Sequence, residues 1–382
     1  MNVPSPSQEF DASEFGSKRG FLPEVAPLDS FPSDAPPSFR RVDELATDLP
    51  EYLRRGDLRS SVRALDPPSA GAIEDCSRRE LLRLYAVTGF LASAYVHRVG
   101  DENADSLPAG VAVPLYESAS RLDRSPMLSY DAYVLHNWTL RDGSRGPSPD
   151  NLDTLLQFTS MRDERWFIAI HVAIEDSAGP AVSAVTDLLP ALRDDDRAVI
   201  ERRLGDIESS LAEIVGHLDR MPEQNEPAVF NSTFRQYLRP FEGVTYEGVS
   251  ELDGPQSYRG ASGAQTALFA ALDSLLGIDH DDNPLLNHVR DLRDDIPPKH
   301  AEFIDAIDAR PDVRSYVSSL GDDDLTTAYN DCLTQLLRFR ERHTEIVKTF
   351  LAGDLDEFEG TGGTPYGHYL DELRDTTENH LL

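Results

Sequence analysis

Lysine is scarce in this sequence: Lys18, Lys299 and Lys348 are its only lysines, among 36 basic residues in a chain of 382. Acidic residues number 68, and the formal net charge is −32 at pH 7. A surface this acidic repels the phosphates of nucleic acids and of anionic membranes, so neither is expected as a partner. Because high salt screens the repulsion between acidic groups, the composition predicts a protein adapted to a salt-rich cytosol rather than an acidic binding module.

Cysteines and long apolar runs are also scarce. The two cysteines, Cys76 and Cys332, give no disulfide framework, and neither a CxxC nor a CxxCH motif is present. The start, MNVPSPSQEF, lacks the basic and apolar stretches of a secretory signal, and no apolar run approaches the roughly 20 residues of a membrane helix. Phosphate-loop, HExxH and GxSxG motifs are absent as well. We therefore expect a soluble, cytoplasmic protein.

Strand signals are few and helical patterns many, so the sequence predicts an all-α fold. Residues 1–40 carry seven prolines and are expected to form an irregular arm that packs through RGFLPEVAPL. A chain of 382 residues exceeds the usual single core, which favours two domains. The turn-rich segment 140–151 lies close to the expected boundary. We place the N-terminal arm and a small, mainly helical domain in 1–125, and a large helical domain in 126–382.

Individual helices are predicted from end signals and from apolar periodicity. Ser77 and Glu80 form a capping-box pattern ahead of a long apolar helix. Elsewhere apolar residues recur every three or four positions, as on one face of a helix. The centre of 153–176 is apolar all round, as in a buried helix. Helices are expected at 153–176, 197–220, 264–278 and 325–350 and after Thr364–Pro365, with 230–263 as a loop-like segment.

A single histidine interrupts the apolar stretch RWFIAIHVAIE at residues 165–175. Three roles are open to His171: a buried residue with a satisfied hydrogen bond, a metal ligand, or a catalytic group. Most buried histidines are structural, which favours the first role. The residues around His171 do not by themselves decide among the three.

A second histidine, His343, lies on the apolar face of the helix predicted at 325–350. Arg340 precedes it by three residues and so lies one turn away on a neighbouring face. An imidazole and a guanidinium in this arrangement suit a non-covalent haem, with nitrogen for the iron and the arginine for a propionate. The spacing alone is weak evidence, and a structural histidine is the alternative.

Two further stretches could bind a ligand. In FNSTFRQYL, Phe230 could stack on a flat substrate while Arg235 holds its carboxylate. The alternative is a surface arginine on a helix. The stretch GTGGT at 360–364 has the backbone freedom of a loop that closes over a ligand, and a plain linker is equally compatible with it.

Taken together and in order, these stretches resemble the indoleamine 2,3-dioxygenase family. The resemblance also covers LSYDAYVLHNW, YRGASGAQTALFAALDSLLGI, PPKHAEFI and YNDCLTQLLRFRERHTEIV, and so extends over nearly the full chain. It implies an all-α, two-domain protein whose large C-terminal domain holds haem b without a covalent bond. It also implies an enzyme that uses O2 to open the indole ring of L-tryptophan. The product would be N-formylkynurenine, in tryptophan catabolism by the kynurenine pathway.

On the haem side, the resemblance assigns roles residue by residue. His343 matches the proximal ligand of the haem iron, and Arg340 matches the arginine that contacts a propionate. Ser262, in GASGAQ, matches the serine beside the haem and is taken as both cofactor-binding and catalytic. Asp273 matches a buried acid on the haem side.

On the substrate side, the resemblance assigns Arg235 to the substrate carboxylate and Phe230 to the aromatic position near it. Tyr130 and Phe167 match aromatic positions of the indole pocket. Thr361, in GTGGT, matches the threonine of a mobile loop that helps to bind the amino-acid end of the substrate.

The sequence also departs from the family pattern. RGASGAQ is poorer in glycine than is usual, and Tyr133 replaces a smaller residue of the animal enzymes, so the pocket is expected to differ in shape. His171 stands where those enzymes have serine. Related tryptophan 2,3-dioxygenases use a histidine at this place to accept a hydrogen bond from the indole N–H. A neutral imidazole can do so if its other nitrogen is protonated, and packing stays open as the alternative for His171.

Two other functions of the same fold therefore remain: an enzyme acting on another indole, and an oxygen carrier or sensor without dioxygenase activity. As a dioxygenase, the protein would take a small indole and O2 as its partners. It would also need an electron donor, which the sequence does not specify, to keep the haem iron ferrous.

Overall fold

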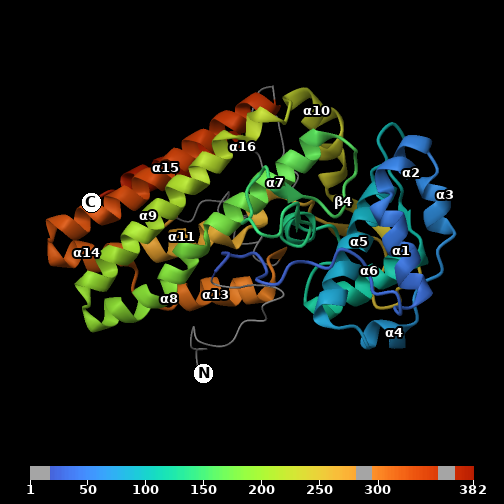
Figure 1. The fold of residues 1–382 in the computed structure, drawn as a ribbon, viewed down its shortest axis with the longest axis horizontal. Helices are drawn as coiled ribbons and strands as arrows, with labels where there is room; N and C mark the ends of the chain where they lie inside the picture. Colours follow the sequence, from blue (N-terminus) through green and yellow to red (C-terminus); the bar gives the residue numbers. More distant parts are fainter. Residues whose placement is uncertain (1–17, 281–294, 352–365) are drawn as a thin grey trace.

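The computed structural model describes residues 18–280, 295–351 and 366–382. These parts are mostly helical with a few short strands, which confirms the predicted all-α class. The molecule is elongated, with the early helices gathered at one end and the later ones forming a longer body at the other (Figure 1). Thr361, Thr364 and Pro365 lie outside the described residues.

The smaller end is built mainly from the chain before α7 (Arg162–Ser177). Its longest helix, α5, begins with the predicted capping box: the Ser77 N–H donates to Glu80 at 2.8 Å, and the Glu80 N–H donates back to Ser77 Oγ. The elements of this part are α1 (Pro37–Thr47), α2 (Leu49–Arg55), α3 (Leu58–Arg63), α4 (Ala70–Glu74), α5 (Arg78–Val96), β1 (Ser106–Leu107), α6 (Ala109–Leu122), the π-helical turn η1 (Asp131–Leu135), β2 (Thr139–Leu140) and β3 (Leu152–Asp153).

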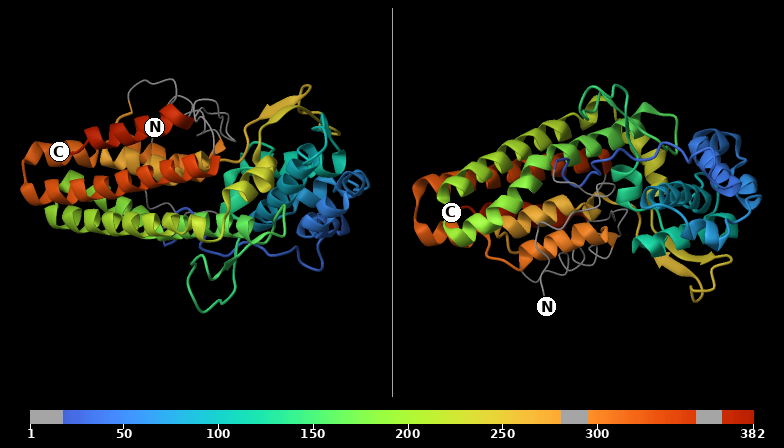
Figure 2. Two further views of the ribbon diagram at one scale, coloured as in Figure 1. Left: turned by 90° about the horizontal axis from the view of Figure 1, so that it is seen from above. Right: turned by 60° about the horizontal axis from the view of Figure 1, so that its bottom comes forward.

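The larger end is a bundle in which α9 packs along both α8 and α15, as all views show (Figures 1 and 2). Its elements are α7 (Arg162–Ser177), α8 (Gly179–Asp194), α9 (Arg197–Asp219), η2 (Met221–Glu223), α10 (Pro227–Ser232), η3 (Phe234–Leu238), η4 (Gly263–Gln265), α11 (Ala267–Leu276), α13 (Pro298–Asp308), α14 (Val313–Leu320), α15 (Asp323–Leu351) and α16 (Tyr366–Asn379). The helices predicted at 197–220, 264–278 and 325–350 correspond to α9, α11 and α15 and are confirmed. Among the described residues, no helix combines the length and the apolar character needed to cross a membrane.

Short strands bring a later part of the chain back to the smaller end of the molecule. The segment 230–263, expected to be loop-like, in fact contains the end of α10, all of η3 and the strands β4 (Phe241–Tyr246) and β5 (Gln256–Tyr258). Strand β4 pairs in parallel with β1 and antiparallel with β5. The chain thus returns from the larger end to the smaller one, a long-range pairing that local sequence patterns do not reveal.

The buried apolar residues form two clusters. The first takes residues between Leu22 and Ala173 and again between Tyr237 and Ala261. The second consists mainly of residues beyond Trp166, and Phe21 of the N-terminal arm joins it. The arm therefore packs through its RGFLPEVAPL stretch, as expected. The division of the chain into domains at residue 125 stays a prediction.

Helix α7 is shorter than predicted, because it begins at Arg162 rather than near residue 153. The reason is Glu164, whose carboxylate accepts hydrogen bonds from the N–H groups of Phe158 and Thr159 at 2.8 and 2.7 Å and from the Thr159 hydroxyl at 2.7 Å. These bonds hold the preceding residues in a loop folded over the start of the helix. The prediction that 153–161 is helical is therefore wrong.

Helix α7 packs against both apolar clusters, which explains why its centre is apolar all round. Ile168 and Val172 belong to the first cluster, whereas Trp166 and Ile170 belong to the second. A third edge of the helix faces a cavity, described next, so the fold places α7 between the two cores and beside the candidate site.

Candidate haem and substrate cavity

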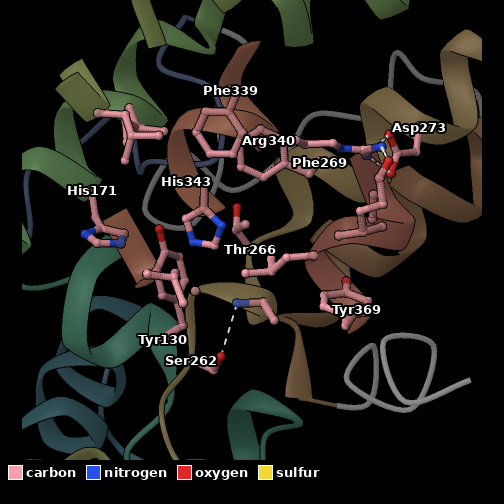
Figure 3. A pocket seen from close by; sticks show the side chains of 18 of the residues that line it. Tyr130, His171, Ser262, Thr266, Phe269, Asp273, Phe339, Arg340, His343 and Tyr369 are labelled. Atoms are coloured by element: carbon pink, nitrogen blue, oxygen red, sulfur yellow. Dashed lines mark hydrogen bonds and ion pairs between the residues drawn. The ribbon is translucent and has the colours of Figure 1, made fainter. Parts of the chain in front are cut away.

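A cavity of about 750 Å³ lies in the larger end, beside the junction with the smaller end. This volume is in the range typical of small-molecule and cofactor sites. Figure 3 shows its lining, which comes from segments far apart in the sequence. The walls that matter below are Tyr130 and Tyr133 at η1, Phe167, His171 and Glu175 on α7, Phe230 on α10, Arg235 on η3, Ser262 before η4, Thr266, Phe269 and Asp273 at α11, and Phe339, Arg340 and His343 on α15.

His343 presents its imidazole to this cavity from the second half of α15 (Figure 3). Its ring is parallel to that of Phe339, with the two centroids 6.0 Å apart. Within the described residues, neither ring nitrogen has a hydrogen-bond partner. Burial, together with the nearby imidazole of His171, lowers the pKa of His343 to about 4, so the ring is neutral at pH 7. A neutral imidazole facing a cavity is the form that binds a metal ion.

His171 lies on α7 and lines the same cavity. Its Nδ1 is 2.8 Å from the carbonyl oxygen of Phe167, and because a carbonyl only accepts, Nδ1 must carry the proton. Burial lowers the pKa of His171, so the ring is neutral and Nε2 is left as an acceptor. A Cβ on Gly263 would lie 4.0 Å from Nε2, which places this nitrogen against the loop before α11.

Glu175 follows His171 by one helical turn and is only 1% exposed. Its Oε1 accepts hydrogen bonds from the Tyr130 hydroxyl at 2.9 Å and from the Thr266 hydroxyl at 2.6 Å. Thr266 is also the N-cap of α11 and accepts from the Leu268 N–H at 3.2 Å. Burial raises the pKa of Glu175 to about 7, although both hydroxyl groups act to lower it. The carboxyl group therefore joins three walls of the cavity.

Arg340 also reaches the cavity, but its guanidinium is held by protein groups. Nη2 lies 2.6 and 2.7 Å from the two carboxylate oxygens of Asp273, while Nη1 donates to the Leu373 carbonyl at 2.7 Å and to Thr377. His280 Nε2 lies 2.9 Å from Asp273. Burial opposes ionisation of Asp273, but Arg340 and His280 outweigh it and hold the pKa of Asp273 below its ordinary value. Arg340 and Asp273 thus form a buried ion pair between α15 and α11.

Aromatic rings line the part of the cavity near Arg235. Phe167 lies with its ring centroid 5.4 Å from that of Phe230 and 4.3 Å from that of His171. Phe230 also contacts Phe350 of α15, at 5.7 Å. A flat apolar ligand with a carboxylate matches these walls, because the rings offer apolar contact and Arg235 offers a cation.

The turn η1 supplies Tyr130 and Tyr133 from the smaller end. It is π-helical, with the His136 N–H bonded to the Asp131 carbonyl at 2.8 Å, and π-helical turns are frequent at functional sites. Tyr133 is buried, with Phe90 at 5.6 Å and Phe158 at 6.2 Å behind its ring. The wall it forms is therefore backed by other aromatic rings.

Ser262 stands before η4, where it caps the turn by accepting from the Ala264 N–H at 3.3 Å. In the same turn, Gln265 accepts from the N–H of Ser262 at 3.2 Å and from the N–H of Tyr130 at 3.0 Å. Gln265 thereby ties the loop to the segment before η1.

The structure brings nine of the predicted site residues to one cavity: His171, Ser262, Arg235, Phe230, Tyr130, Phe167, His343, Arg340 and Asp273. The tenth, Thr361, lies outside the described residues. Sequence reasoning missed Glu175 and Thr266. The one signal for Glu175 was its position: Phe167, His171 and Glu175 follow one another at intervals of four residues and so lie on one face of a helix. Within the described ranges, no group of three or more His, Cys, Asp or Glu side chains is arranged to hold a metal ion.

Comparison with known proteins identifies a family for the chain. Residues 8–355 match the family model described as indoleamine 2,3-dioxygenase. The chain is 32% identical to mouse indoleamine 2,3-dioxygenase 1 over 364 residues, covering 88% of each protein. It is 28% identical to human indoleamine 2,3-dioxygenase 2, covering 91% of each. It is also 28% identical to the indoleamine 2,3-dioxygenase of Saccharomyces cerevisiae, covering 87% of this chain and 78% of the yeast protein.

Proposed function

This chain belongs to the indoleamine 2,3-dioxygenase family, and on that premise we propose that it opens the indole ring of L-tryptophan with O2 to give N-formylkynurenine. The observation that carries the proposal is the shared cavity. A neutral imidazole on α15 that no described residue hydrogen-bonds, an arginine on η3 and an acceptor histidine on α7 all line one space of about 750 Å³.

The residues of the cavity fit haem b. His343 would hold the iron, because its ring is neutral and no other described residue occupies its nitrogens. Phe339 and Phe269, whose stacked rings lie 4.2 Å apart, would pack against the macrocycle. The bound haem would supply the O2 chemistry, and the protein positions the substrate and excludes water. We assign Ser262, Arg340 and Asp273 to the haem side, with Arg340 near a propionate while it also keeps its bonds to Asp273.

On the substrate side, Arg235 would hold the carboxylate of tryptophan by a bidentate contact, while Phe230 and Phe167 pack on the indole ring. Tyr130 completes the apolar wall, and its hydroxyl is already used by Glu175. Thr361 keeps its proposed contact with the amino-acid end of the substrate.

His171 would accept a hydrogen bond from the indole N–H. The tautomer supports this role, because Nδ1 keeps its proton to donate to the Phe167 carbonyl, and the lone pair of Nε2 is left to accept. Packing alone would need no such acceptor beside a cavity.

The composition supports two further proposals. The protein would work in a salt-rich cytoplasm, and its acidic surface would bind neither nucleic acid nor an anionic membrane. Reduction of the iron would come from a one-electron donor.

The central experiment loads the purified protein with haem, reduces it, adds L-tryptophan in air and follows the absorbance of N-formylkynurenine. His343→Ala should abolish the Soret band that the wild-type protein gains with haem, because the iron would lose its protein ligand. A normal Soret band in the variant would refute the ligand assignment.

The wall at Tyr133, which Phe90 and Phe158 back, favours one second candidate, an enzyme of the same type acting on another indole. Turnover of a different indole with a flat trace for tryptophan would establish it. Stable O2 binding without turnover of any indole would instead indicate a carrier or sensor.

A further inference from the structure

Glu175 is a buried acid at the cavity that the proposed reaction does not use. Both of the hydroxyl groups that reach it bind the same oxygen, Oε1. The other oxygen, Oε2, is buried and has no hydrogen-bond partner in the described part of the chain. A carboxylate oxygen without a partner is costly to bury, whereas a protonated carboxyl group carries no charge there.

Among the residues that the structure describes, the groups that face Glu175 do not supply a cation. The segment before η1 contributes the Tyr130 hydroxyl, and the start of α11 contributes the Thr266 hydroxyl. On α7 itself, His171 is neutral, and Asp176 lies 3.9 Å from Arg19 of the N-terminal arm.

The α15 wall of the cavity presents His343, which is neutral, and Arg340, whose charge is balanced by Asp273. Any positive charge that stabilises the ionised carboxylate of Glu175 would therefore come from the bound cofactor. That charge changes with oxidation state, since ferric haem carries one positive charge more than ferrous haem at the iron.

We propose that Glu175 takes up one proton when the haem iron gains an electron and releases it when the iron is oxidised. The inference rests on the proposed function, because it requires haem in this cavity. In reduction, a one-electron donor gives its electron to ferric iron, and a proton from solvent binds to the carboxylate of Glu175. The products are ferrous iron and a neutral carboxylic acid, so charge in the cavity is conserved.

The direction of the pH effect follows from this linkage. Burial raises the pKa of Glu175 to about 7, and the extra charge of ferric haem would lower it. Between the pKa values of the two oxidation states, raising the pH favours the ferric form, so the reduction potential falls. One pH unit is a tenfold change in proton activity, and for one electron this corresponds to at most about 59 mV.

The experiment measures the reduction potential of the haem-loaded protein at a series of pH values around the pKa of Glu175, with redox mediators. Wild type should show a potential that falls with pH in this range, and Glu175→Gln should flatten the slope. Asp176→Asn is the matched control. Burial also raises the pKa of Asp176, to about 6, but its carboxylate faces Arg19 instead of the cavity, so its variant should keep the wild-type slope.

A measurement on the wild-type protein keeps the proposal testable if Glu175→Gln does not fold. The reduced-minus-oxidised infrared spectrum should gain the C=O stretch of a protonated carboxylic acid, and Thr266→Val should shift that band because it removes one donor to the carboxyl group.

The possible failures are distinguishable. Failure to bind haem would overturn both this proposal and the proposed function. Haem binding with equal slopes in wild type and Glu175→Gln, or with no carboxylic acid band on reduction, would overturn the role of Glu175 alone.

Discussion

Replacing Asp273 with asparagine tests whether the charge of Arg340 is balanced by the protein itself. Asp273 binds Arg340 through both carboxylate oxygens, and the Arg340 side chain is only 6% exposed. Asparagine has nearly the same shape but no charge. Asp273→Asn would therefore leave the guanidinium buried without a counter-ion.

The structure sets the size of the expected effect. Removing one partner of a buried ion pair costs about 3–5 kcal/mol, because the other charge is left uncompensated. Arg340 keeps its bonds to the Leu373 carbonyl and to Thr377, so we expect the lower end, about 3 kcal/mol in the free energy of unfolding. An exposed pair would cost only about 1 kcal/mol or less.

The assay is urea unfolding of the haem-free protein, followed by far-ultraviolet circular dichroism, so that no propionate can act as a substitute counter-ion. The double variant Asp273→Asn/Arg340→Met is the matched control. It removes both charges, and most of the lost stability should return.

Two results would refute the reasoning. A loss below about 1 kcal/mol for Asp273→Asn would mean that Arg340 does not depend on Asp273 in the haem-free protein. A double variant no more stable than Asp273→Asn would mean that the uncompensated charge is not the cause.

Two further predictions concern histidines. If His171 accepts a hydrogen bond from the indole N–H, 1-methyltryptophan, which lacks that hydrogen, should be a poorer substrate than tryptophan. His171→Ser should then narrow the difference in kcat/KM between the two substrates. An unchanged difference would leave His171 as a packing residue. Burial, with the charge of Arg124, lowers the pKa of both His136 and His300 from 6.5 to about 3. Between these two pH values the unfolded chain therefore binds protons at both histidines that the folded chain does not bind. The free energy of unfolding of the haem-free protein should fall as the pH drops from 6.5 towards 3, by about 1.4 kcal/mol per pH unit for each histidine. His300→Gln should reduce this slope, and an unaltered slope would count against a lowered pKa for His300.

Local patterns in the sequence predicted several elements correctly, because the interactions that define them are local. The capping box of Ser77 and Glu80 joins residues three apart, and it begins α5 as expected. The apolar stripe of 197–220 became α9, and that of 325–350 became α15, with His343 on the side that faces the cavity.

Other features depend on contacts between distant residues, which no local pattern contains. The start of α7 is set by Glu164, which folds back to bind the loop before it. The pairing of β4 with β1 brings residues 241–246 back to the smaller end. Resemblance to a family indicated Arg340 as a propionate contact, but it did not reveal that Asp273 already binds this guanidinium.

The sequence by itself determined the helical class of this protein, the face on which His343 lies and, through resemblance, the family. Periodicity and capping act within a few residues and survive in any fold that contains the helix. The tertiary structure alone decided which groups meet. It set His171 and His343 on walls of one cavity, fixed the proton of His171 on Nδ1, and left Oε2 of Glu175 buried with no hydrogen-bond partner among the described residues. These outcomes follow from the packing of α7 between two apolar cores, because that packing decides which charges water can no longer reach.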